Sequence, residues 1–330
     1  FPTGAKDRFA PEFTGQNSGA FMFHAAAPAR RVAPPIRRSF VRRNLPYLLI
    51  APSVIMLLVL IAYPLLFALR SSLYFWNLQI GPEPQAFVGF DNYVQAFQAF
   101  DFQDALVNTL ILSITGTAIE FVLGLAIALL LLRAVPGMNV ARALLIMPTT
   151  IAPIVVGFLF RYLYDPSGGL MTWVLTLIGL PVPPQGLLGS PSTALAAVLF
   201  ADVWQWTPFF SIVLYASLLS VPDEIIEAAR LDRASAWTIL MRIKLPLIRR
   251  TAIIIVMLRF MQLFNTFDTV LVLTRGGPGT STRTLGYSLY EQGLVNFNIG
   301  LASAMTWITV LIVNIIVGLY VFFAFRNEEW

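Results

Sequence analysis

Long apolar stretches that lack charged residues alternate with short polar segments along this chain of 330 residues. Stretches such as 44–69 and 292–325 exceed the roughly 20 residues that an α-helix needs to cross a bilayer. The pattern therefore predicts an all-α membrane protein. Six transmembrane helices are expected, at about residues 46–69, 105–132, 143–163, 193–219, 251–273 and 301–325.

Composition agrees with a membrane protein and excludes several kinds of chemistry. Charged residues make up 12% of the chain, about half of what a soluble domain carries. The chain has no cysteine, which excludes disulfides and thiolate metal sites, and its single histidine, His24, lies in a polar segment. We therefore expect neither a catalytic residue nor a metal site.

The positions of lysine and arginine predict the orientation in the membrane. If the N-terminus is cytoplasmic, 17 of the 22 basic residues fall in cytoplasmic segments. Arg259 lies within the fifth predicted span, and four remain on the outer side: Arg70, Arg161, Arg275 and Arg283. Both termini are therefore expected in the cytoplasm.

Two regions differ in composition. Residues 1–44 are predicted to be a disordered, basic cytoplasmic tail, and residues 45–330 a transmembrane domain. The basic cluster in the tail could bind nucleic acid or anionic lipid headgroups, but it is more simply explained as the signal that orients the first span. We expect membrane lipid as a partner and no nucleic acid.

The outer loops are short. FVGFDNYVQAF, residues 87–97, predicts a small amphipathic helix at the interface. MTWVLTLIGL, residues 171–180, is too short to span and predicts a re-entrant or surface helix. Neither loop is long enough to form a folded outer domain, so any capture of solute would be the task of another protein.

Residues 221–250 form the most informative loop. Pro222, followed by two acidic residues, predicts a helix start. A second helix is expected from Ser235 to Leu245, where Pro246 would end it. Such a helix–turn–helix could dock a partner protein or rest on lipid headgroups, and the spacing alone does not separate these alternatives.

Ionisable residues inside the predicted spans are candidates for a solute path. Charges within a bilayer are costly and usually face a cavity or pair with one another. The fifth span carries a polar stripe at helical spacing, and the fourth a polar and aromatic patch beside Trp206. Alternatively, Arg259 neutralises Asp202 or Glu120 as an interhelical pair. The predicted path comprises Asp202, Trp204, Gln205, Arg259, Gln262, Asn265 and Thr266.

Several motifs resemble one family. Glu227-Ala228-Ala229, followed by Asp232, Ala234, Ile243, Leu245 and Pro246, resembles the EAA loop of permease subunits of binding-protein-dependent ATP-binding-cassette (ABC) importers. FVGFDNY, MPTTIAPIVVGFLFRYLYDPSGG and LTRGGPGTSTRTLGYSLY resemble the carbohydrate branch of that family, the maltose and glycerol-phosphate type. The resemblance covers about residues 45–325.

The resemblance implies a type I ABC importer permease fold in a bacterial inner membrane. It also implies three kinds of partner: a second, similar permease, two copies of an ATP-binding subunit, and an extracytoplasmic solute-binding protein. ATP and Mg would be bound by the ATPase subunits, and this chain, which lacks the GxxxxGK[ST] phosphate loop, would need no cofactor. Contact with the ATPase would fall to Glu227, Ala228, Ala229, Arg230, Asp232, Arg233 and Pro246.

One position departs from the family pattern. Arg233 stands where the family usually has glycine, which would allow a positive φ between the two short helices at no steric cost. Either the turn is built differently, or Arg233 makes a compensating contact with the ATPase.

The solute implied by the resemblance is a sugar or oligosaccharide, and Arg259, Arg275 and Arg283 would be compatible with an anionic one. A proton-coupled secondary transporter is the alternative function, although it would not need the EAA-like loop. An intramembrane hydrolase would require a nucleophile or metal site that the sequence lacks.

Overall fold

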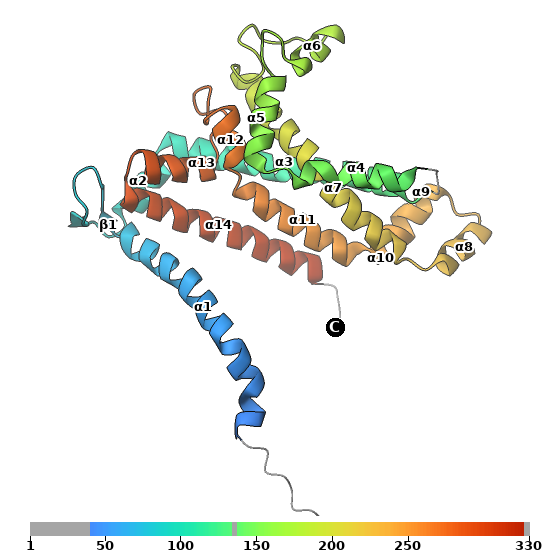
Figure 1. The fold of residues 1–330 in the computed structure, drawn as a ribbon, viewed down its shortest axis with the longest axis horizontal. Helices are drawn as coiled ribbons and strands as arrows, with labels where there is room; N and C mark the ends of the chain where they lie inside the picture. The colour runs from blue at the N-terminus through green and yellow to red at the C-terminus, as the bar shows by residue number, and fades with distance from the viewer. Residues whose placement is uncertain (1–39, 134–136, 327–330) are drawn as a thin grey trace, which may run out of the picture. The chain divides into compact units, whose positions relative to one another are not determined.

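The computed structural model describes residues 40–133 and 137–326, so most of the predicted 1–44 tail lies outside the described residues. Helix α1, Phe40–Ser72, contains the first predicted span (Figure 1). The chain divides into two compact units, residues 1–57 and 58–330, and the packing described below lies within the second.

Within the described residues, four helices are long and apolar enough to cross a membrane: α1, α3 (Phe100–Leu131), α7 (Pro191–Leu219) and α14 (Ile299–Phe325). A fifth crossing is counted if α4 (Met138–Thr150) and α5 (Pro153–Leu163) form one span. The helical membrane architecture agrees with the sequence prediction, whereas a count of six is not established by helix length alone.

The third predicted span, 143–163, is sharply bent rather than continuous. Its two helices, α4 and α5, meet at 97°. Pro153 opens α5, and a proline disfavours helical backbone at the residue before it, so Ala152 is extended. Pro148 removes a further backbone donor from the end of α4. Gln205 donates to the carbonyl of Ile151 at the bend, with Nε2 and O 2.8 Å apart.

The fifth predicted span, 251–273, is broken. Helix α11, Arg249–Phe264, ends at Asn265, and helix α12, Asp268–Leu273, begins three residues later. At the break, the backbone carbonyl of Thr266 accepts a hydrogen bond from Thr284 Oγ1, at 2.9 Å. Hydropathy reports only composition, so it could not reveal this interruption.

Short elements complete the side that the sequence predicts to be outer. The helices expected at 87–97 and 171–180 correspond to α2 (Asp91–Gln98) and α6 (Leu170–Leu177). Strands β1 and β2 pair antiparallel, with Tyr74 opposite Phe87. The remaining outer elements are β1 (Tyr74–Phe75), β2 (Ala86–Phe87), α13 (Leu285–Tyr290) and the π-helix η2 (Glu291–Val295).

The loop 221–250 forms α8 (Asp223–Leu231), α9 (Ala236–Ile239), the π-helix η1 (Leu240–Lys244) and α10 (Leu245–Leu247). The expected start at Pro222 is present, and Ser235 Oγ accepts from the backbone of Thr238. The expectation that Pro246 ends the second helix was wrong, because the helix continues through it to Leu247. The wider π-turn just before the proline relieves the crowding that its ring causes.

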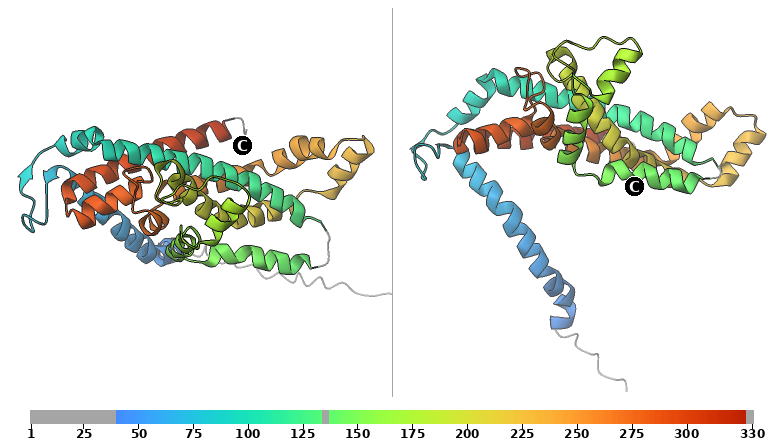
Figure 2. Two further views of the ribbon diagram at one scale, coloured as in Figure 1. Left: turned by 90° about the horizontal axis from the view of Figure 1, so that it is seen from above. Right: turned by 45° about the horizontal axis from the view of Figure 1, so that its top comes forward.

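Helix α7 lies at the centre of the second unit, in contact with α3, α4, α5, α11 and α12 (Figure 2). Its approach to α3 depends on Gly124, where a Cβ would lie only 2.4 Å from the Cβ of Phe210. Apolar side chains form three buried clusters, one around α5, α7 and α12, one around α7, α11 and the 221–250 loop, and one around α2, α3, α13 and α14.

Candidate functional site

Three ionisable side chains from three helices meet in the interior. Arg259 on α11 donates from Nε and Nη2 to the two carboxylate oxygens of Glu120 on α3, at 2.8 and 3.0 Å. Its Nη2 also donates to Asp202 on α7. The exposed fractions are 3% for Arg259, 0% for Glu120 and 6% for Asp202. We call this group the buried ion cluster.

Burial of a charge is costly unless the charge is paired, and the buried ion cluster supplies pairing across three helices. Arg259 therefore forms the predicted interhelical ion pair, and it does so with both Glu120 and Asp202 rather than with one of them. The guanidinium also lies over the ring of Trp206, with its central carbon 4.7 Å from the ring centre.

A cavity of about 180 Å³, the inner cavity, lies beside the buried ion cluster at the α11–α12 break. Its walls are polar side chains and two aromatic rings from α7 and from residues 259–269, together with the first residue of α5. The lining residues are Pro153, Asp202, Trp206, Arg259, Gln262, Asn265, Thr266, Phe267, Asp268 and Thr269.

The structure brings five of the seven predicted path residues together around the inner cavity: Asp202, Arg259, Gln262, Asn265 and Thr266. Trp204 and Gln205 do not line it. The Trp204 ring packs against Phe160, with ring centres 5.4 Å apart, and also lines an apolar groove between α3, α4 and α7. Gln205 is occupied by the carbonyl at the α4–α5 bend.

Sequence reasoning omitted Trp206, Asp268 and Thr269 from the predicted path. Trp206 lies four residues after Asp202, and side chains at that spacing share a helix face, whereas Trp204 points elsewhere. Helical spacing alone would therefore have selected Trp206 over Trp204. Thr269 belongs to the polar stripe that continues past the break.

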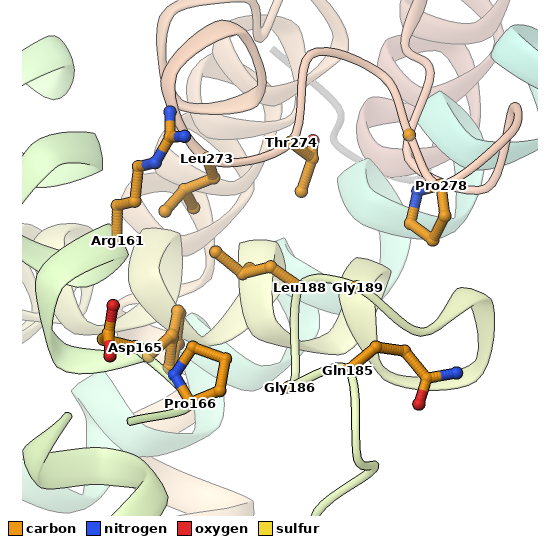
Figure 3. A pocket seen from close by; sticks show the side chains of 12 residues that line it. Arg161, Asp165, Pro166, Gln185, Gly186, Leu188, Gly189, Leu273, Thr274 and Pro278 are labelled. Carbon is orange, nitrogen blue, oxygen red and sulfur yellow. The ribbon is translucent and has the colours of Figure 1, made fainter. Parts of the chain in front are cut away.

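A larger cavity of about 440 Å³, the outer cavity, lies at the other end of α12. Figure 3 shows Arg161 and Asp165 on one side of it, with Thr274 and Pro278 across from them. Arg161 Nη1 donates to the carbonyl of Val272 at 3.0 Å. The six residues of α12 span about 9 Å, so one short helix separates the two cavities.

The outer segment 274–298 is attached to α3 by polar contacts. Asn108 Nδ2 donates to the carbonyls of Thr280 and Arg283, at 2.8 and 3.0 Å. Arg283 forms ion pairs with Asp101 and Glu291, so this predicted anion ligand is already paired with two carboxylates.

Tyr287 lies beside these pairs. Burial raises its pKa, the carboxylate of Glu291 adds to the rise, and Arg283 opposes it. The phenol therefore keeps its proton at neutral pH.

The predicted coupling residues cover the exposed side of the 221–250 loop. Glu227, Ala228, Arg230, Asp232, Arg233 and Pro246 are exposed, and Ala229 is half-buried. Ile226 and Ile239 face inward and belong to the same buried cluster as Leu214 and Leu218 of α7. The loop is therefore packed against the membrane helices on one side and exposed on the other.

Large apolar side chains also lie on the exposed side of this loop. Leu231 is 85% exposed and Trp237 is 67% exposed. Arg233 has φ of +57°, so the turn adopts the left-handed conformation that glycine would favour, and it is not built differently.

No group of three or more histidine, cysteine, aspartate or glutamate side chains is arranged to hold a metal ion in residues 40–133 and 137–326. The ionisable residues of the inner cavity are instead paired with one another or directed toward its space.

Comparisons with known proteins identify relatives over most of the chain. Residues 120–328 match the family described as binding-protein-dependent transport system inner membrane component. The chain is 34% identical to the trehalose/maltose transport system permease protein MalF of Thermococcus litoralis, covering 83% of this chain and 92% of that protein. It is 35% identical to the trehalose transport system permease protein SugA of Mycobacterium tuberculosis, covering 80% and 83% respectively.

A solved structure shares the fold. A chain of a bacterial ABC transporter involved in the import of the acidic polysaccharide alginate superposes with a TM-score of 0.75. The identity is 23%, and the match covers 88% of this chain and 98% of the other.

Proposed function

The chain belongs to the family of binding-protein-dependent transport system inner membrane components, and we propose that it is the permease subunit of an ATP-driven importer of a sugar or oligosaccharide. The observation that carries the proposal is the match over most of the chain to permeases named for trehalose and maltose transport. The chain itself is non-catalytic, and partner subunits bind and hydrolyse ATP.

The inner cavity supports a sugar path. Sugars are held by hydrogen bonds to their hydroxyl groups and by aromatic faces, and Trp206, Gln262 and Asn265 provide both kinds of group. Broken helices at membrane depth are tolerated where they line a cavity, and transporters use them as binding sites. The α11–α12 break lies beside Asp202 and Thr266 at the inner cavity, which supports a binding site there.

The size of the inner cavity supports a second permease. Small-molecule pockets usually measure about 300–1,000 Å³, and this cavity of about 180 Å³ would enclose only part of a disaccharide. A second, similar permease facing it would supply the rest of the path. An extracytoplasmic solute-binding protein would deliver the sugar to the outer side, where the outer cavity opens.

The 221–250 loop supports coupling to an ATPase. Its inner face is packed into the buried cluster of α7 and α11, so a movement of the loop must displace those helices. Its outer face presents Glu227 together with the exposed Leu231 and Trp237, which suits docking into a cleft of an ATP-binding subunit. Two copies of that subunit would serve the two permeases.

The proposed topology has six crossings with both termini in the cytoplasm of a bacterial inner membrane. The four long helices and the bent pair α4–α5 give five crossings, and the proposal takes the broken pair α11–α12 as the sixth. The distribution of lysine and arginine supports this orientation.

Replacement of Glu227 tests the function. In the complex isolated with its ATPase subunits and returned to vesicles, Glu227→Lys is expected to lower ATP-driven sugar uptake at least tenfold, because it reverses the charge at the docking face. Glu224→Lys, an exposed residue of the same helix outside the EAA run, is the matched control. Uptake and ATP hydrolysis are measured together, with membrane insertion checked by detergent extraction.

Unchanged uptake in Glu227→Lys would remove this residue from the coupling mechanism. Isolation of the chain without an ATPase, combined with uptake driven by a proton gradient, would instead establish the alternative, a secondary transporter.

A further inference from the structure

The charges around the inner cavity point to a class of sugar, an inference that rests on the proposed transport function. We propose that this cavity accepts neutral or amino sugars and rejects acidic ones, and that Asp202 and Asp268 impose the selection.

Carboxylates outnumber cations around the inner cavity. Asp202 and Asp268 line it, and Arg259 is the one cation among the lining residues, all of which lie in the described part of the chain. Glu120 pairs with Arg259 from behind. The formal charge of this group is therefore negative by two, and it stays negative even if the neighbouring carboxylates share one proton.

Arg259 has little capacity left to bind an anion. Its Nε and Nη2 donate to the carboxylates of Glu120 and Asp202, and its face lies over the ring of Trp206. Because Nε and Nη2 are both engaged, an acidic sugar could form a bidentate pair with this guanidinium only by displacing a carboxylate. The charge of Arg259, one of the three arginines that suggested an anionic substrate, is thus already neutralised.

Asp268, in contrast, is available to a ligand. It is exposed at the start of α12, and no hydrogen bond or ion pair joins it to another residue in the described part of the chain. A carboxylate accepts hydrogen bonds from sugar hydroxyls or from a protonated amine, and it repels another carboxylate.

Of the arginines near the outer approach to the cavity, Arg161 and Arg283 are already engaged, and Arg275 is exposed on the segment that follows α12. Arg283 is paired with Asp101 and Glu291. At the outer cavity, Arg161 donates to a backbone carbonyl, and Asp165 lines the same cavity with the opposite charge. An acidic sugar would therefore meet one exposed cation, Arg275, before the carboxylates of the inner cavity, and the selection falls to these carboxylates.

The test uses the complete transporter in vesicles, with its binding protein and ATPase. Uptake is compared for three radiolabelled probes: maltose, an analogue with a carboxylate at one C6 position, and an analogue with an amino group. The wild type is expected to transport the acidic probe at least tenfold more slowly than maltose. Asp268→Asn should lower the ratio of maltose uptake to acidic-probe uptake at least threefold, because it removes one repelling charge and retains the shape of the side chain.

The control variant is Glu83→Gln, which removes an exposed outer carboxylate that does not line either cavity. Because all variants share one binding protein, its own preference cancels when the ratios of two variants are compared. A changed ratio therefore reports on this chain.

Each outcome has a defined meaning. A narrowed ratio in Asp268→Asn, with no change in Glu83→Gln, supports the selection. Equal uptake of acidic and neutral probes by the wild type, or a ratio that neither Asp268→Asn nor Asp202→Asn alters, overturns it and leaves the transport function intact. If no probe crosses in any variant and ATP hydrolysis does not respond to sugar, the proposed function itself fails.

Discussion

The buried ion cluster predicts a large effect for replacement of Arg259 by methionine. The side chain makes two hydrogen bonds to Glu120 and a further one to Asp202, all with charged groups and all sheltered from water. Methionine fills a similar length without a charge, so both carboxylates would be left buried and unpaired. Removal of one partner from a buried ion pair typically costs about 3–5 kcal/mol, and the two carboxylates place this variant at the upper end.

A control variant shows whether the loss of stability is specific to Arg259 or follows from the loss of any arginine. Arg161→Met removes a single hydrogen bond to the backbone carbonyl of Val272, for which a cost of about 1 kcal/mol is expected. A second variant, Arg259→Met combined with Glu120→Gln, removes one of the two stranded charges and should recover at least about 1 kcal/mol relative to Arg259→Met alone.

The assay measures the apparent unfolding midpoint of the purified complex in mild detergent. The readout is the loss of soluble, monodisperse protein on heating. Arg259→Met should lower the midpoint by about 8 °C or more, at roughly 2 °C per kcal/mol for a unit of this size. Arg161→Met should lower it by only a few degrees. A midpoint for Arg259→Met within the error of the wild type would refute the conclusion that the cluster joins α3, α7 and α11.

Two backbone features give further predictions. Gly124→Ala places a Cβ only 2.4 Å from Phe210 Cβ, so the variant should lose about 1–3 kcal/mol of stability, measured by the same midpoint. Gly318→Ala is the control, because a Cβ there meets nothing within 4 Å, and a neutral or slightly raised midpoint is expected. Arg233→Gly should relieve about 1 kcal/mol of strain from the left-handed backbone and raise the midpoint. A lowered midpoint would contradict the conclusion that Arg233 is strained. Weaker binding of the ATPase by this variant would show that Arg233 contacts that subunit.

Local physical chemistry made much of this protein predictable from its sequence. A membrane excludes unpaired polar backbone, so long apolar stretches become helices, and α1, α3, α7 and α14 fall where hydropathy places them. Capping chemistry is equally local, which is why the starts after Pro222 and Ser235 were predictable.

The tertiary structure decided where helices break or bend. The stretch 251–273 is apolar enough for one helix, yet it is interrupted at residues 265–267. At this break the hydroxyl of Thr284 donates a hydrogen bond to the carbonyl of Thr266. Helix η1–α10 passes through Pro246 because a π-turn makes room for the ring, an adjustment that no local rule for proline anticipates. The break at residues 265–267 and the helix that continues through Pro246 both depend on interactions with neighbouring groups rather than on local composition.

The candidate site shows the same division. The sequence by itself determined that Asp202 and Arg259 are too costly to leave in lipid and must face a cavity or a partner. Only the tertiary structure decided that both occur together: Arg259 meets Glu120, 139 positions away, and also borders a cavity. Pairing and lining depend on how each helix is rotated about its axis, and that rotation is set by the packing of all its neighbours, such as the close approach of α3 to α7 at Gly124.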